Sequence, residues 1–265
     1  MSQQTMPHEG TLNRVPRVTA DFWLIKLVAV TMGETAADYL AVNMGYGLTV
    51  TSIFMAGILV AALAVQFWQK RYVPWSYWLA VVLISVVGTL VTDNLVDNFG
   101  VALETTTVVF TIALAATFAV WYAFERTLSI HSIFTFRREA FYWLAILFTF
   151  ALGTAAGDLV AEAFGFGYLT TAIIFGAVIA LIAAGYHVLG VNSILAFWLA
   201  YIFTRPLGAS IGDLLSQPLD YGGLGLGTTV TSLIFLAMIV ATVIYMTMRY
   251  EPETAELPVG EAFKS

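Results

Sequence analysis

Long apolar segments recur along the whole of this 265-residue chain and leave little choice of fold. A helix needs about 20 mainly apolar residues to cross the hydrocarbon core of a bilayer. The sequence therefore predicts an all-α polytopic membrane protein with eight transmembrane helices and with disordered tails at 1–20 and 250–265. The predicted spans are approximately 22–42, 48–68, 76–96, 105–124, 141–161, 168–187, 193–215 and 227–247.

The composition excludes several other classes of protein. Hydrophobic residues make up 60% of the chain and charged residues only 11%, whereas a soluble domain is about 25% charged. The net charge of −6 argues against a nucleic-acid partner, which would need a basic face. Cysteine is absent, so disulfides, thiolate nucleophiles and cysteine-based metal sites are excluded.

Basic residues alternate sharply between the connections. They fall in the tails and in the connections that follow every second span, while the other connections contain none. By the positive-inside rule, both termini and the basic connections are expected in the cytoplasm. These residues are Arg14, Arg17, Lys70, Arg71, Arg126, Arg137, Arg138 and Arg249.

A fourfold internal repeat carries most of the specific information. Each repeat opens with a tryptophan, followed ten residues later by a glycine and five residues after that by an aspartate. The second span of each repeat opens with a threonine. The tryptophans are Trp23, Trp78, Trp143 and Trp198, the glycines Gly33, Gly88, Gly153 and Gly208, the aspartates Asp38, Asp93, Asp158 and Asp213, and the threonines Thr51, Thr106, Thr171 and Thr231.

Each repeat contains two spans, so all four repeats share one orientation in the membrane. This predicts parallel repeats about an axis along the membrane normal, as a pseudo-fourfold or a twofold of halves. The predicted repeats cover residues 21–72, 73–138, 139–190 and 191–249.

This pattern resembles a family of bacterial membrane proteins built from four tandem two-helix repeats of unknown function, each with a characteristic tryptophan. The resemblance covers residues 20–248. It implies a location in the bacterial inner membrane, and it brings no settled activity or site residues.

The repeated tryptophans are expected to anchor the cytoplasmic interface, and Lys26 is expected to snorkel there. The repeated glycines lie roughly at the bilayer midplane. Each has a small residue four positions later, so the glycines form seams that let helices approach closely. Close helix packing accounts for them fully.

The aspartates are harder to explain as packing, because an acidic side chain within a membrane helix is costly. One interpretation is structural: each carboxylate caps the start of a second helix, with the repeated threonines completing a polar bracket. The other is a ring of carboxylates and hydroxyls near the outer mouth that binds a cation. Oxygen ligands suit hard divalent metals, and four close carboxylates would share protons.

Departures from the repeat add a second candidate feature. One position after the glycine the repeats read Glu34, Thr89, Thr154 and Ala209, so only the first repeat carries an acid. Arg205 is the only charged residue at its own repeat position. An arginine this deep should be paired. Glu34 lies at nearly matching depth and is the expected partner, with Asp38 and Asp213 as alternatives. The pair either locks the first repeat to the fourth or acts as a gate.

These features predict a transporter or channel for a small cation, either a divalent metal ion or a cation whose transport is coupled to protons. Its site would contain the four aspartates, the four threonines and Glu34. A transporter of small organic compounds and a non-transport scaffold remain alternatives. No nucleophile constellation or nucleotide motif indicates an enzyme or a cofactor, apart from a bound divalent cation. The expected partners are the lipid bilayer, the cation and a second copy of the chain.

Overall fold

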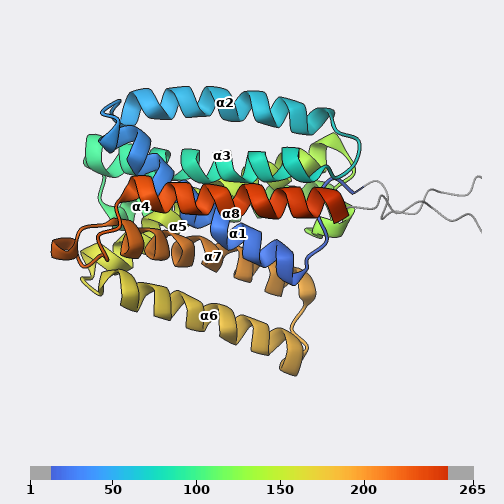
Figure 1. The fold of residues 1–265 in the computed structure, drawn as a ribbon. Helices are drawn as coiled ribbons and strands as arrows, with labels where there is room; N and C mark the ends of the chain where they lie inside the picture. Colours follow the sequence, from blue (N-terminus) through green and yellow to red (C-terminus); the bar gives the residue numbers. More distant parts are fainter. Residues whose placement is uncertain (1–12, 250–265) are drawn as a thin grey trace, which may run out of the picture.

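The computed structural model describes residues 13–249, and the predicted tails outside that range, 1–12 and 250–265, are not described. The described chain is all-α, with eight long helices (Figure 1). Each predicted span coincides with one of them. They are α1 (Ala20–Asp38), α2 (Leu48–Trp68), α3 (Pro74–Asp93), α4 (Leu103–Glu125), α5 (Phe136–Asp158), α6 (Gly167–Leu189), α7 (Ser193–Ser216) and α8 (Thr228–Arg249).

Seven of these helices, all except α1, are long and apolar enough to cross a membrane. The helix α1 is 19 residues long and differs because it carries Asp21, Lys26, Glu34 and Asp38. The largest difference from the predicted bounds is at α5, which begins at Phe136 rather than 141. There the Thr135 side chain accepts a hydrogen bond from the Arg138 N–H and caps a charged first turn.

The first helices of the four repeats form the centre of the molecule. The helix α1 packs against α3, α3 against α5, α5 against α7, and α7 against α1, which closes a ring. The second helix of each repeat lies outside and packs on the first helix of the next repeat: α2 on α3, α4 on α5, α6 on α7 and α8 on α1 (Figure 1). Each repeat is thus completed by its neighbour.

Burial separates the two sets of helices. Within the apolar windows of α3, α5 and α7, 56–67% of residues are buried, against 11–22% in α2, α4, α6 and α8. The outer helices expose Val, Ile, Leu and Phe side chains, as expected of surfaces that face lipid. The repeat aspartates lie at the ends of the buried inner helices, whereas the repeat threonines lie on the outer ones.

The repeated glycines make the ring possible. A Cβ placed on each would come within 2.0–2.9 Å of a side-chain atom of the next inner helix. The contacts are cyclic: Gly33 meets Ser85, Gly88 meets Phe150, Gly153 meets Arg205, and Gly208 meets Val30. In each case the partner lies three residues before the glycine of its own repeat. Close packing of the inner helices is therefore the role of these glycines.

The inner helices end in an unusual way. A π-helical turn follows directly after the repeat aspartate in the first three repeats, at Tyr39–Asn43, Asn94–Asn98 and Leu159–Ala163. In the fourth repeat α7 runs to Ser216 and is followed by a glycine-rich loop with a short 3-10 helix, Leu219–Tyr221. Such π turns occur often at functional sites.

The N-terminal segment is ordered from residue 13, which corrects the prediction of a disordered tail over 1–20. The Asn13 side chain bonds to the backbone of Ile130 and Ile133, and Val15 is buried. The Arg14 guanidinium lies 2.5 Å from the buried carboxylate of Glu139. Together these contacts fix the segment across the end of the ring at which the inner helices begin.

Candidate functional site

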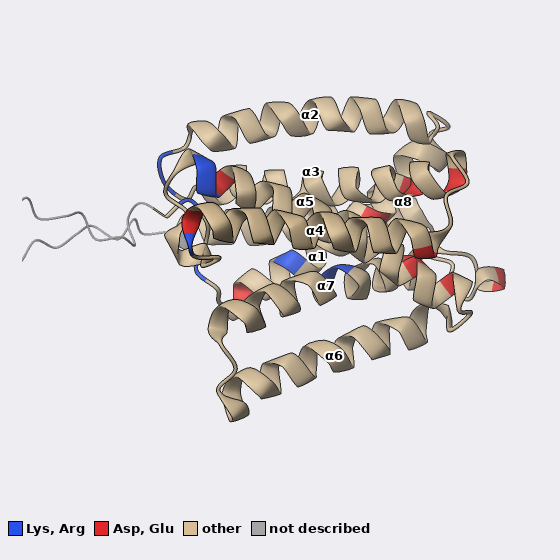
Figure 2. Ribbon diagram, turned by 180° about the vertical axis from the view of Figure 1, so that it is seen from behind, with Lys and Arg blue, Asp and Glu red and all other residues tan. Residues whose placement is uncertain are grey.

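Charge is distributed unevenly along the helix ring. Lysine and arginine gather mainly at the end where the inner helices begin, which we call the basic end (Figure 2). Acidic residues dominate the opposite, acidic end, although some lie at the basic end too. Two positively charged positions lie apart from the basic end, in the middle of α1 and α7 (Figure 2), and the sequence identifies them as Lys26 and Arg205.

The acidic end encloses a cavity of about 200 Å³, which we call the acidic vestibule. Seven of its lining residues carry carboxylates and none is lysine, arginine or histidine. The structure thus brings all four repeat aspartates and Glu34 to one cavity. The charged and amide residues of its lining are Glu34, Asp38, Asp93, Asp97, Asp158, Glu162, Asp213 and Gln217.

A second tier of lining residues stands four positions after the repeat aspartates: Val42, Asp97, Glu162 and Gln217. The sequence placed Asp97 and Glu162 in connections between spans. They lie instead in the π turns that continue α3 and α5, which keeps them on the side of the cavity. Their constant spacing from the aspartates was the signal that could have identified them. Asp220 lies in the exposed 3-10 helix and does not line the cavity.

Three of the four repeat aspartates have no hydrogen-bond donor. Within residues 13–249, no side chain or backbone N–H donates to Asp93, Asp158 or Asp213, whereas the Gln217 Nε2 group donates to Asp38 Oδ2 at 3.3 Å. The alternative in which each aspartate caps a second helix is therefore not supported by their contacts. A carboxylate without donors, among other carboxylates, attracts a cation.

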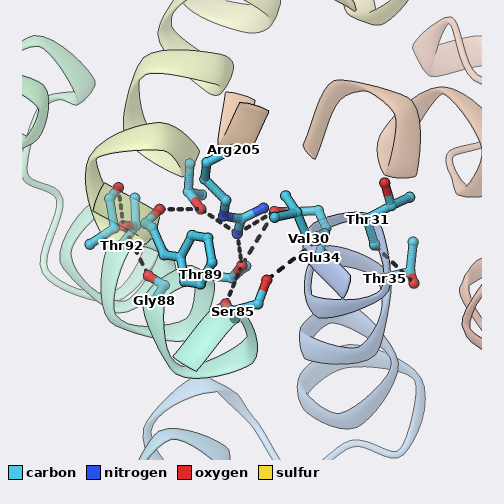
Figure 3. Close-up of polar contacts among 12 residues, drawn as sticks. Val30, Thr31, Glu34, Thr35, Ser85, Gly88, Thr89, Thr92 and Arg205 are labelled. Atoms are coloured by element: carbon cyan, nitrogen blue, oxygen red, sulfur yellow. Dashed lines mark hydrogen bonds and ion pairs between the residues drawn. The ribbon is translucent and has the colours of Figure 1, made fainter. Parts of the chain in front are cut away.

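The inner end of the vestibule is closed by Arg205, which is fully buried. Its Nη2 atom lies 2.9 Å from Glu34 Oε2, donates to Thr154 Oγ1 at 2.7 Å and also donates to Thr89 Oγ1. Figure 3 shows the guanidinium reaching from α7 toward Glu34 of α1 and Thr89 of α3. Glu34 is the partner that its depth in the sequence suggested.

These three partners occupy the same position in the first, second and third repeats, and Arg205 comes from the fourth. Its guanidinium therefore lies on the axis of the ring, held by one side chain from each other repeat. Gly153 leaves room for the arginine stem, because a Cβ there would meet Arg205 Cγ at 2.3 Å. The Nε and Nη1 atoms find no acceptor among the described residues.

The repeated threonines do not complete the carboxylate site as the sequence predicted. The hydroxyls of Thr106, Thr171 and Thr231 donate to the carbonyl four residues earlier in their own helices, and that of Thr51 is buried without a partner in the described chain. None of the four lines the vestibule. They open the outer helices, and each of these packs on the next repeat's inner helix rather than facing the axis.

The repeated tryptophans are also placed differently from the prediction of interface anchors. Trp78, Trp143 and Trp198 are buried, and Trp23 is half-buried against Phe22 and Phe197. The indole N–H groups of Trp78, Trp143 and Trp198 bond inside the protein, as when Trp198 Nε1 donates to the Leu128 carbonyl at 2.9 Å. The ring of inner helices is closed tightly enough to enclose them.

Lys26 does not snorkel to an interface. It is fully buried, and its ammonium donates to the Tyr201 carbonyl at 2.8 Å and lies 3.9 Å from the centre of the Tyr201 ring. The sequence alone does not determine the environment of Lys26, because a lysine three residues after a tryptophan fits both a membrane interface and a buried site.

The vestibule is not a preformed metal chelate. No three acidic or histidine side chains within residues 13–249 come close enough to hold one metal ion directly, the four repeat aspartates included. A larger cavity of about 770 Å³ opens between α1, α6 and α7, but its lining has no Asp, Glu, Lys or Arg. The vestibule is thus the cavity suited to recognising charge.

Comparison with known proteins identifies the repeat. No curated protein and no solved structure matches this chain. The family described as Repeat of Unknown Function (DUF347) matches it four times, over residues 22–72, 76–127, 141–191 and 196–250. Each match begins one or two residues before the tryptophan that opens the repeated spacing of tryptophan, glycine and aspartate. The chain therefore belongs to this family of repeat proteins and carries four copies of its repeat.

Proposed function

We propose that this protein binds a small cation in the acidic vestibule and moves it across a membrane. The observation that carries the proposal is the convergence of four repeat aspartates in one cavity without a basic lining residue. Unpartnered carboxylates inside a membrane helix bundle are costly, and such groups mark ion pathways. A cleft of one charge sign also concentrates counter-ions.

The distribution of ligands favours a cation that keeps part of its water shell. The carboxylates surround the cavity without forming a direct chelate, and its volume of about 200 Å³ leaves room for several water molecules. Mg²⁺ sheds water reluctantly and is usually held through only one or two carboxylates. It is therefore the first candidate among divalent ions, and a small organic cation of similar size is the second.

Arg205 would act as the gate at the inner end of this site. It is a tethered cation that already occupies the place below the vestibule and neutralises Glu34. A cation entering the vestibule competes with the guanidinium for that carboxylate. The helix also contains Pro206, which removes one backbone hydrogen bond beside the arginine and gives α7 a place to bend.

The arrangement in the membrane follows the same proposal. All eight helices span the bilayer as four parallel repeats, with the ring axis along the membrane normal. The basic end and both termini face the cytoplasm of a bacterial inner membrane, as the positive-inside rule favours. The vestibule then opens to the outside.

The test is the melting temperature of the detergent-purified protein with Mg²⁺, Ca²⁺, Mn²⁺, Na⁺ or tetramethylammonium, because a ligand of the folded state raises it. Mg²⁺ is expected to raise the melting temperature of the wild type but not of Asp158→Asn. Asp220→Asn is the matched control, since it removes an exposed acid outside the vestibule, and it should respond like the wild type. Uptake of the same ion into proteoliposomes then tests movement.

Two results would overturn the proposal: no stabilisation by any of these cations, or equal stabilisation of wild type and Asp158→Asn. Stabilisation by tetramethylammonium alone would replace the metal by an organic cation.

A further inference from the structure

A second buried cation lies on the axis of the ring beyond Arg205. The ammonium of Lys26 has one hydrogen-bond acceptor, the carbonyl of Tyr201, and no carboxylate within ion-pair distance in the described chain. The remaining contacts are with aromatic faces, Tyr201 at 3.9 Å and Phe150 at 5.7 Å from the ring centres. An ammonium in such surroundings is expensive to bury.

The two cations are linked through one aromatic ring. Phe150 occupies the repeat position of Arg205, and its ring centre lies 5.9 Å from the Arg205 guanidinium carbon and 5.7 Å from Lys26 Nζ. Arg205 thus contacts Glu34 of the vestibule, and the Phe150 ring lies against both Arg205 and Lys26. Positive charge added at the vestibule and positive charge on Lys26 repel each other across a medium of low dielectric constant.

Arg205 and Lys26 differ in whether they can relieve that repulsion by losing a proton. A guanidinium stays protonated in proteins, whereas an ammonium can give up a proton and become a neutral amine. We infer that Lys26 exchanges one proton in response to cation binding in the vestibule, so that the protein couples the two movements. This inference rests on the function proposed above and adds its coupling ion.

The groups around Lys26 set the direction in which the proton leaves. Toward the vestibule it meets Phe150 of α5 and the charged Arg205 of α7. Toward the basic end lie the buried hydroxyls of Tyr201 of α7, which has no partner in the described chain, and then of Tyr142 of α5 and Tyr77 of α3. The one buried carboxylate described on that side, Glu139 of α5, is already paired with Arg14. The helix α8, on the other side of α1, carries no charged residue among its described side chains.

The last two hydroxyls are joined by a hydrogen bond of 2.5 Å. Hydroxyl groups both accept and donate protons. The ammonium of Lys26 thus loses H⁺ to become the amine, and the proton passes toward the basic end while the cation occupies the acidic end. The stoichiometry is one proton released toward the basic end for one cation bound at the acidic end.

The experiment measures proton release when Mg²⁺ is added to the detergent-purified full chain in weakly buffered solution with an indicator dye. Lys26→Arg keeps the positive charge but cannot release a proton. It is expected to bind Mg²⁺ and to release about one proton fewer per bound ion than the wild type, as linkage requires of a single titrating group. Lys70→Arg, the same substitution at an exposed lysine, should release as many protons as the wild type.

Equal proton release from the wild type and a Mg²⁺-binding Lys26→Arg would overturn the coupling and leave the proposed function intact. If Lys26→Arg does not fold or bind, Lys26→Met decides in the same way, since it removes both the proton and the charge. If no cation of the panel changes the melting temperature of the wild type and Mg²⁺ releases no proton, the proposed function and the coupling are overturned together.

Discussion

Glu139 and Asp158 lie near opposite ends of the same helix, α5, and the protein treats their carboxylates in opposite ways. Glu139 is buried and accepts hydrogen bonds from Arg14 at 2.5 Å, Gln66 at 3.1 Å and Trp143 at 3.3 Å. Asp158 lies in the vestibule and receives no hydrogen bond from any described residue.

The basic end and the acidic end of the helix ring differ in the same way as these two carboxylates. At the basic end two glutamates are paired with arginines, Glu139 with Arg14 and Glu125 with Arg137 and Arg138. The axis there is filled by aromatic rings such as Tyr77 and Tyr142. At the acidic end the axis opens into a cavity. Carboxylates thus hold the structure together at one end, and at the other they are left available to a ligand.

The largest loss of stability is expected when Glu139 is replaced. Replacing it by leucine leaves Arg14 without its partner, and breaking a buried ion pair costs about 3–5 kcal/mol of unfolding free energy. Asp158→Asn should leave stability unchanged or raise it, because it removes repulsion among like charges. Denaturant titration of both variants in detergent micelles measures the difference. A loss as large in Asp158→Asn as in Glu139→Leu would mean that the vestibule is structural.

An intermediate effect is expected in the seam that joins the two ends. Gly208→Val places a side chain where a Cβ already meets Val30 Cγ1 at 2.5 Å, so overpacking should cost about 1–3 kcal/mol. Gly176→Ala is the control, because its Cβ meets only Leu207 Cδ1 at 3.9 Å; removing a helix glycine there should stabilise by about 0.4–1 kcal/mol. Equal stability of the two variants would contradict the ring of close contacts.

The smallest effect separates two threonines. Thr171 bonds only to a carbonyl of its own helix and lies outside the vestibule, so Thr171→Ala should leave the response to cations unaltered. Thr154→Ala removes a hydrogen bond to Arg205 and should cost about 1 kcal/mol. Melting temperatures with and without Mg²⁺ distinguish them. If Thr171→Ala lost its response to cations, Thr171 would have to belong to the cation site.

The helices and the repeat could be predicted from the sequence because a bilayer fixes the length of a span and because the repeat spacing is exact. The meeting of the four aspartates followed from that spacing too. The pairing of Arg205 with Glu34 followed from their depth alone, since both lie within a turn or so of a repeated glycine.

The rest depends on which way each helix faces, which spacing alone does not determine. The threonines lie on outer helices that pack on the next repeat, and a pattern read within one repeat does not reveal that partner. The tryptophans are enclosed by the neighbouring inner helices, so their position near an interface in sequence was misleading. Asp97 and Glu162 were missed because a π turn carried the helix beyond its expected end.

The packing of α8 on α1 has a consequence for how the protein is made. A chain is synthesised from its N-terminus, and domains fold as they emerge. The surface of α1 that receives α8 is among the first to reach the membrane, yet its cover is the last helix to arrive. That face of α1 must therefore stay open to lipid or to an assisting factor until the final helix covers it.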